Sequence, residues 1–271
     1  MKNKMVAIFL MALMFTTLIP AVAYADESTI FMSEKELRAK RLKFESLEKF
    51  VGISESQSFV PQYSILSTGV TIGANALLYP TAGKVYTSDV AARTEAAQGG
   101  SWLDCRTEYL PFAAGSGYAW GWIGEYITVS GSGSRTCNIT INGRYDGELE
   151  ALEINGLPID TNAYASLYLQ VYDVTGGGFT LVKQQKVFER GVTFTMLPNQ
   201  IVGTLGSSQK MSCTLQAGRN YLIRASLRTE ADCGVSSITN IQVWGRSDFA
   251  SNPKGPNGQG ADISSIRIEW I

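Results

Sequence analysis

The sequence predicts an all-β protein, an antiparallel β-sandwich or jelly roll, preceded by a signal peptide and one amphipathic helix. Short segments in which apolar and polar residues alternate recur from Trp102 to the C-terminus. Gly- and Asn-rich turns separate these segments, and no helical pattern intervenes. Charged residues make up 17% of the chain, against roughly 25% in ordinary soluble domains, and 27 residues are glycine. This composition is typical of an exported β protein.

Residues 1–25 have the form of a signal peptide. Lys2 and Lys4 precede an apolar run at 5–18, and Ala23-Tyr24-Ala25 supplies the small residues that a signal peptidase requires. The apolar run is too short to span a bilayer as a stable helix, and no second one follows. We therefore expect a secreted protein, extracellular or periplasmic, with no membrane span after cleavage.

A single amphipathic helix is expected within residues 26–52. Ser33 and Glu36 have the spacing of a capping box, and residues 34–51 contain neither Gly nor Pro. Leu37 and Phe44 lie seven residues apart, which places them on one apolar face. We expect this helix to pack on the domain or to protrude from it. A pro-segment or a partner-binding helix is the alternative.

Residues 53–271 are expected to form one β-sandwich domain. Its first part is weakly patterned, with short strands predicted at 59–66 and 84–87 and a helical turn at 89–98. Beyond it, strands are predicted at 118–129, 135–142, 148–154, 163–174, 179–188, 209–215, 221–228, 238–244 and 263–271. The expected turns lie at 131–134, Asn142-Gly143, Asn155-Gly156, 176–178 and Gly218, the last of which joins a hairpin.

The composition excludes several classes of function. Histidine is absent, so Ser-His-Asp and Cys-His catalysis cannot be built from this chain, and His-ligated zinc and iron sites are also excluded. The net charge of −1 offers no basic surplus, which argues against nucleic acid as a partner. We expect no cofactor. Oxygen-ligated calcium stays open, as does catalysis by carboxylates, Lys or Tyr.

The four cysteines predict two disulfides if the protein is exported. Three connectivities are open, and the sequence does not choose among them. We favour Cys105–Cys137 together with Cys213–Cys233 because short intervals close most readily. The alternative is that some cysteines stay reduced and serve as small buried apolar residues.

Two aromatic stripes are the best candidates for a ligand-binding surface. Strand alternation places four aromatic side chains on one face of the predicted strand at 118–129: Tyr118, Trp120, Trp122 and Tyr126. In the strand at 163–174, three tyrosines oppose the aliphatic face: Tyr164, Tyr168 and Tyr172. Exposed aromatic rings on a rigid sheet stack on sugar rings and offer hydrogen bonds from their edges. Packing within the protein core is the competing interpretation.

Carboxylates are the second group of candidates. Asp146, Glu148 and Glu150 are spaced two apart, so in a strand they share a face that could serve glycoside hydrolysis or bind calcium. We expect instead the solvated side of an edge strand. Glu108 and Glu125 are alternative carboxylates near the aromatic residues. The loop at 248–262 offers further oxygen atoms but lacks EF-hand spacing, and Asn138-Ile139-Thr140 matches an N-glycosylation motif that we treat as incidental.

Three functions follow from these observations. The first is an exported non-catalytic module that binds polysaccharide or cell wall through the aromatic stripes. The second is a structural protein of the cell surface or extracellular matrix that self-associates through sheet edges or through the helix. A carboxylate-based glycosidase or lyase is the third, and toxin-like or inhibitor roles complete the set. The sequence resembles no family specifically enough to name one.

Overall fold

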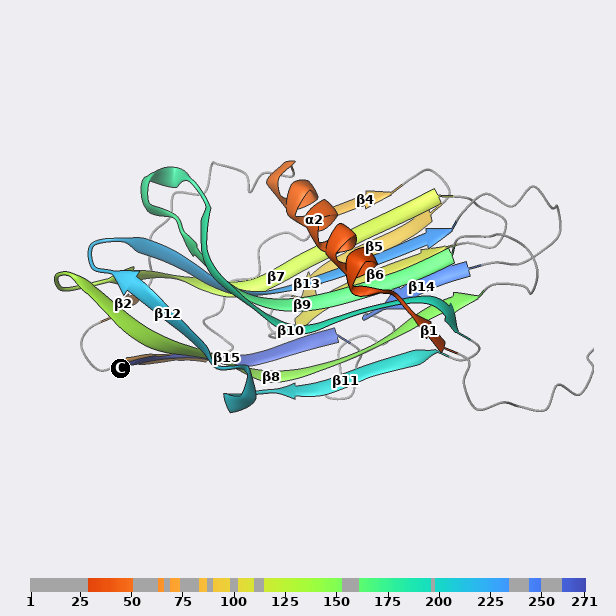
Figure 1. The fold of residues 1–271 in the computed structure, drawn as a ribbon. Helices are drawn as coiled ribbons and strands as arrows, with labels where there is room; N and C mark the ends of the chain where they lie inside the picture. Colours follow the sequence, from red (N-terminus) through yellow and green to blue (C-terminus); the bar gives the residue numbers. More distant parts are fainter. Residues whose placement is uncertain are drawn as a thin grey trace, which may run out of the picture.

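Two mainly antiparallel sheets pack face to face, which confirms the predicted all-β sandwich (Figure 1). The computed structural model describes the following residues: 29–50, 63–65, 69–73, 83–86, 90–97, 102–109, 115–152, 161–195, 198–233, 244–249 and 260–271. The expected signal peptide, the turn at Asn155-Gly156 and most of the loop at 248–262 lie outside them. Within the described ranges, no helix has the length and hydropathy that a membrane span requires.

The first sheet has seven strands in the order β1-β10-β9-β13-β7-β2, and β4 also pairs with β7. Its strands are β1 (Thr29–Phe31), β2 (Tyr63–Ile65), β4 (Gly83–Tyr86), β7 (Gly115–Val129), β9 (Thr161–Asp173), β10 (Thr180–Thr195) and β13 (Asn220–Cys233). All pairings are antiparallel except that of β2 with β7. The central strand β13 lies between β7 and β9 along its whole length.

The second sheet has eight strands in the order β11-β8-β14-β6-β15-β3, with β12 paired to β8 and β5 paired to β6. Its strands are β3 (Val70–Gly73), β5 (Val90–Ala97), β6 (Trp102–Tyr109), β8 (Ser134–Leu152), β11 (Asn199–Leu205), β12 (Met211–Gln216), β14 (Trp244–Asp248) and β15 (Gly260–Trp270). Two short 3-10 helices, η2 (Thr175–Gly177) and η3 (Ser207–Gln209), lie in turns.

The main core lies between the two sheets. Alternation along each strand sends aliphatic side chains inward, so that residues such as Ile123, Leu167 and Leu227 from the first sheet join Ile139 and Ile266 from the second. Nearly every residue of β9 is buried on both of its faces. A strand buried on both faces needs a cover on its outer side as well as its inner side, so this sheet has a third layer above it.

Helix α2 (Glu34–Phe50) lies on the outer face of the seven-stranded sheet (Figure 1). The predicted capping box is confirmed: the Ser33 amide and hydroxyl donate to Glu36 Oε2 at 2.7 and 2.6 Å, and the Glu36 amide donates to Ser33 Oγ at 3.4 Å. Just before the helix, the Met32 amide donates to the carbonyl of Gly191 in β10 at 2.8 Å. The helix is therefore fixed at its start and packs on the domain.

Two local predictions were wrong because strand pairing overrides local preference. The expected helical turn at 89–98 forms β5, which pairs with β6 from Val90↔Tyr109 to Ala97↔Trp102. The expected hairpin around Gly218 does not form, since β12 and β13 belong to different sheets. Gly218 keeps its positive φ of 78°, but its amide donates to the carbonyl of Val129, so the turn carries the chain from one sheet to the other.

The turn expected at Asn142-Gly143 is also absent, because β8 runs through it as one strand of 19 residues. Opposite it, Asn142 pairs with Ser265 and Gly143 with Ile263, which leaves one extra residue in β15 as a bulge. Gly143 has φ 153°, and a Cβ atom there would lie 1.9 Å from the Asp262 carbonyl oxygen. The Asn-Gly pair thus accommodates a bulge in the middle of the sheet.

Gly143→Ala should lower the free energy of unfolding by about 1–3 kcal/mol, because the new Cβ atom both strains the backbone and strikes Asp262. Gly178→Ala is the matched control, since a Cβ atom there meets nothing within 4 Å. Urea unfolding monitored by fluorescence measures both. Equal midpoints for the two variants would contradict the close approach at Gly143.

Candidate functional site

The two predicted aromatic stripes lie on the same face of the seven-stranded sheet. Strand β13 lies between the two strands that carry the stripes. Because residues in register on neighbouring strands point to the same side of a sheet, the face consists of rows of three residues, one from each strand. The five rows, each written from β7 through β13 to β9, are Tyr118–Glu230–Tyr164, Trp120–Arg228–Ser166, Trp122–Ser226–Tyr168, Gly124–Arg224–Gln170 and Tyr126–Leu222–Tyr172. We call this surface, which faces away from the eight-stranded sheet, the aromatic face.

The aromatic face is covered, although it lies opposite the side that packs on the eight-stranded sheet. Its Tyr118, Trp120 and Tyr164 cluster with Phe44, whereas Trp122 and Tyr126 belong to the main buried cluster. Tyr172 is half-buried, and the other six stripe residues are buried, with Tyr164 fully inaccessible. Covering them does not make the surface apolar, since Arg224, Arg228 and Glu230 are buried among the rings. The result is a mixed aromatic and charged layer, which differs from the aliphatic layer between the sheets.

Phe44 of α2 is the apolar anchor of this cover. Its ring is fully buried and lies 5.7 Å from the Tyr118 ring, edge on, and 5.8 Å from the Tyr164 ring, stacked. The Arg228 guanidinium lies 5.9 Å from the Phe44 centroid and 5.3 Å from that of Tyr168. Phe44 with Met32 and Leu37 supplies the apolar contact of the N-terminal segment with this face.

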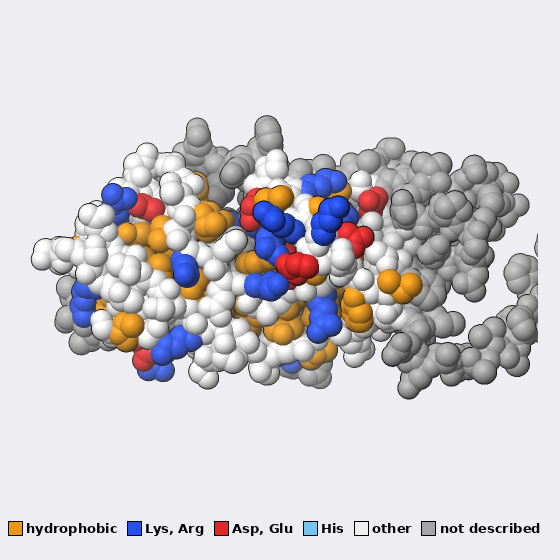
Figure 2. Space-filling model, in the orientation of Figure 1, with side chains coloured by type: hydrophobic (Ala, Val, Ile, Leu, Met, Phe, Trp, Pro, Cys, Tyr) orange, Lys and Arg blue, Asp and Glu red, His pale blue; other side chains and the backbone are white. Residues whose placement is uncertain are grey.

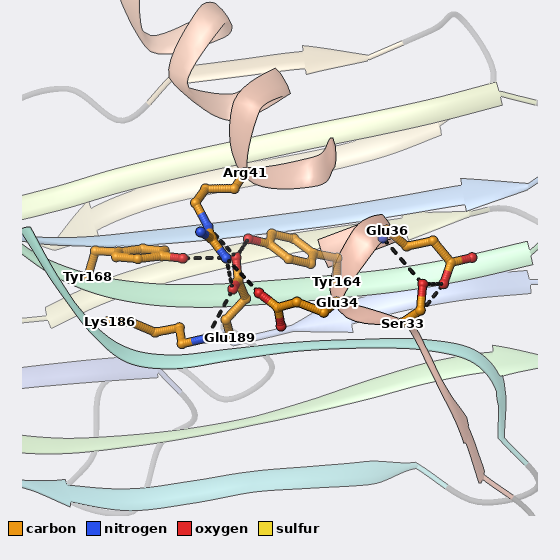
Figure 3. A network of polar contacts seen from close by, with 8 residues as sticks. All are labelled: Ser33, Glu34, Glu36, Arg41, Tyr164, Tyr168, Lys186 and Glu189. Carbon is orange, nitrogen blue, oxygen red and sulfur yellow. Dashed lines mark hydrogen bonds and ion pairs between the residues drawn. The ribbon is translucent and has the colours of Figure 1, made fainter. Parts of the chain in front are cut away.

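Arg41 of α2 makes a two-pronged polar contact with the sheet (Figure 3). Its Nε and Nη2 atoms donate to the two oxygens of Glu189 in β10 at 3.0 and 2.6 Å. The hydroxyls of Tyr164 and Tyr168 donate to Glu189 Oε1 at 3.0 and 2.8 Å. Desolvation alone would raise the pKa of Glu189, but the hydrogen bonds from Arg41, Tyr168 and Tyr164 outweigh it and hold the pKa below its ordinary value.

Two lysines of α2 complete the polar contacts. Lys40 Nζ lies 2.5 Å from Glu230 Oε1 and 2.9 Å from Asn162 Oδ1, and Lys43 donates to the Tyr118 hydroxyl. Glu230 is fully buried, and desolvation raises its pKa despite the opposing charge of Lys40. Figure 2 shows charged side chains gathered where α2 lies, so the cover presents a polar exterior.

Beyond the helix contacts, Arg224 organises the other end of the aromatic face. Its guanidinium lies 4.7 Å from the Tyr172 ring centroid and 5.6 Å from that of Trp122. It also donates from Nε to Gln170 at 2.9 Å and from Nη2 to the Tyr172 hydroxyl at 3.2 Å. Tyr172 in turn lies edge on to the half-exposed Phe179, with centroids 6.3 Å apart.

The carboxylates predicted on β8 do share its outward face, since Leu149 and Ala151 on the other face are buried. We expected them on an edge strand, and this prediction was wrong. Strand β8 has neighbours on both sides, since Glu148 pairs with Gln200 in β11 and with Asp248 in β14. The side chain of Glu108 lies outside the described residues. Among the described side chains, no group of three or more Cys, Asp or Glu residues could hold a metal ion.

Glu125 lies on the inner face of β7, within the main core. It is fully buried, its Oε1 accepts the Tyr126 amide at 2.8 Å, and its Oε2 has no hydrogen-bond partner among the described residues. Desolvation raises its pKa from 4.5 to about 7, against the hydrogen bond from Tyr126. The inward direction separates Glu125 from the aromatic face, so it does not belong to that candidate site.

Neither of the disulfides that we favoured is present. Cys137 and Cys213 are free buried thiols, while the side chains of Cys105 in β6 and Cys233 in β13 lie outside the described residues. Cys137 and Cys213 pair directly across β8 and β12.

Asn138 and Thr140 of the glycosylation motif are buried in β8.

Sequence reasoning missed the charged members of the aromatic face. Arg224 and Arg228 alternate with the apolar residues of β13, which indicates that they share the side opposite the core. This alternation was the available signal, but the pairing of β13 with both stripes could not be inferred from it. Glu189 gave no signal, since its partner Arg41 lies 148 positions away.

No protein-family model matches the chain, and no curated protein sequence is similar to it.

Buried Glu125 should make stability depend on pH. Between pH 4.5 and about 7 the folded protein holds the Glu125 proton that the unfolded chain has lost, so raising the pH through this window lowers the free energy of unfolding. The full loss is about 3 kcal/mol. Urea unfolding at pH 5 and pH 8 should show this loss in the wild type and not in Glu125→Gln. The same pH dependence in both proteins would contradict it.

Proposed function

We propose that the protein is an exported, non-catalytic β-sandwich module that binds polysaccharide or a cell-wall surface through the aromatic face, with α2 as a displaceable cover. The observation that carries the proposal is the register of β7, β13 and β9, which brings seven aromatic side chains onto one face. Aromatic rings stack on sugar rings. The interleaved Arg224, Gln170 and Glu189 supply hydrogen-bond donors and acceptors for hydroxyl groups.

The contacts between α2 and the sheet support the proposal that the helix can be displaced. Interior layers are normally held by aliphatic packing. Helix α2 instead contributes the buried Phe44 ring and the half-buried Leu37, and it contacts the sheet further through Lys40, Arg41 and Lys43. Glu189 and Glu230 are buried, so the helix separates from them only when other donors replace its cations. The hydroxyl groups of a polysaccharide can supply such donors. A helix held in this way can open without unfolding the sandwich beneath it.

Arg41→Glu combined with Phe44→Ala should strengthen retention on an insoluble polysaccharide by about tenfold or more, because each 1.4 kcal/mol removed from the covered form raises the open population tenfold. Arg38→Glu is the matched control, since it makes the same charge change at an exposed position of α2. Pull-down of the full chain against a panel of glucans, chitin and purified cell wall measures retention, and soluble oligosaccharide should release it.

Circular dichroism establishes that the double variant keeps its sheets. A folded double variant that no polymer in the panel retains would contradict glycan binding. Tyr172→Ala in the same background should weaken retention, because Tyr172 is the half-buried end of the aromatic face.

A second function, self-assembly at the cell surface or in the matrix, is favoured by the edge strand β11. Among the described strands β11 pairs with β8 alone, it carries no charge or bulge, and Val202 on it is 63% exposed. An uncharged, regular edge invites pairing with another chain. In β10, the part before Val192 has no partner other than β9 among the described strands, but its pairing with β9 shifts register twice and it carries Lys183 and Lys186.

Val202→Lys should therefore abolish any concentration-dependent association, since a lysine on an edge strand disfavours pairing. Val182→Lys on the irregular edge of β10 is the control that should leave association unchanged. Light scattering during size exclusion at rising protein concentration measures the mass of each protein. A wild type that stays monomeric throughout would exclude assembly through β11.

A further inference from the structure

Cys137 and Cys213 are directly opposed on two antiparallel strands. Cys213 of β12 is the register partner of Cys137 of β8, so both side chains point to the same side, into the main core. The Cys137 thiol already points across the strand pair, with Sγ 3.4 Å from the Cys213 carbonyl oxygen. On the opposite face, the hydroxyls of the adjacent pair Thr136 and Thr214 lie 3.1 Å apart, which supports the same register independently.

This geometry suits a covalent cross-link. Opposed residues of an antiparallel pair have Cα atoms about 4.5–5.5 Å apart, within the range of about 4.4–6.8 Å that disulfides require. Rotation about the side-chain bonds therefore brings the two sulfur atoms together without a change of strand register.

We propose that Cys137 and Cys213 form a reversible disulfide that fastens β12 to β8. The oxidant is itself a disulfide, either a small molecule such as glutathione disulfide or a dithiol oxidase. One cysteine thiolate attacks the oxidant and releases one thiol, and the second cysteine then attacks the mixed disulfide and releases the other. Two protons and two electrons leave the pair, and the oxidant is reduced to two thiols.

The edge position of β12 explains how an oxidant reaches the two buried thiols. Burial raises the pKa of Cys137 to about 12 and also raises that of Cys213, so the closed form holds little thiolate at neutral pH. Among the described strands β12 pairs with β8 alone, and every second residue of β12 is exposed. Oxidation therefore proceeds while β12 opens or before it pairs, and closure afterwards protects the bond.

The experiment maps the linkage in the full chain after equilibration with oxidised glutathione. Free thiols are alkylated, the protein is digested without reduction, and the peptides are identified by mass spectrometry. We expect one peptide pair joined through Cys137 and Cys213. Alkylation of both residues, or linkage of either to Cys105 or Cys233, would overturn the proposal without the need for any variant.

Thermal unfolding provides the second readout. Oxidation should raise Tm by about 5–15 °C, since the bond closes a long loop in the unfolded chain. Cys105→Ser with Cys233→Ser should keep this shift, and Cys137→Ser alone should remove it. Loss of the shift in the first variant, or its persistence in the second, would assign the stabilisation to another pair.

Discussion

The carboxylate of Glu189 is the group on which the third layer of the structure depends. A buried carboxylate is costly unless several donors surround it, and here Arg41 supplies two and Tyr164 and Tyr168 one each. The pairing of β9 with β10 brings Tyr164 and Tyr168 to Glu189, whereas Arg41 reaches it only when α2 lies across these strands in one orientation. The position of the helix is thus set by the geometry of a charge cluster, and Phe44 fills the remaining space among the rings.

The two sides of the seven-stranded sheet are stabilised by different physics. Toward the eight-stranded sheet, burial of aliphatic side chains dominates, with the carboxyl group of Glu125 as the titratable exception. Toward the helix, cations over aromatic rings and buried ion pairs dominate, and their strength changes with protonation and ionic strength. The same strands are therefore stabilised mainly by apolar burial on one side and mainly by charged and aromatic contacts on the other.

The sequence predicted those features that depend on local periodicity. Alternation located β7, β9 and β13 and assigned their faces, and the Ser33–Glu36 spacing located the start of α2. Features that depend on strand register could not be predicted from the sequence. No periodicity shows that β13 separates two aromatic stripes, that Cys137 meets Cys213 76 positions away, or that Asn142-Gly143 accommodates a bulge. Local preference even misled at 89–98, where pairing with β6 imposes a strand.

The placement of β13 has a consequence for the order in which the chain can fold during synthesis. β7 and β9 are made early, but neither can pair with the other, because the strand that separates them spans Asn220–Cys233. Similarly, β8 must wait for β15 at Gly260–Trp270. On the ribosome, β9 can pair with β10 and β7 with β2 and β4, but the edge that each aromatic strand turns toward β13 stays unpaired until Cys233 has emerged. Folding is therefore slow, and these edges are exposed to aggregation during synthesis.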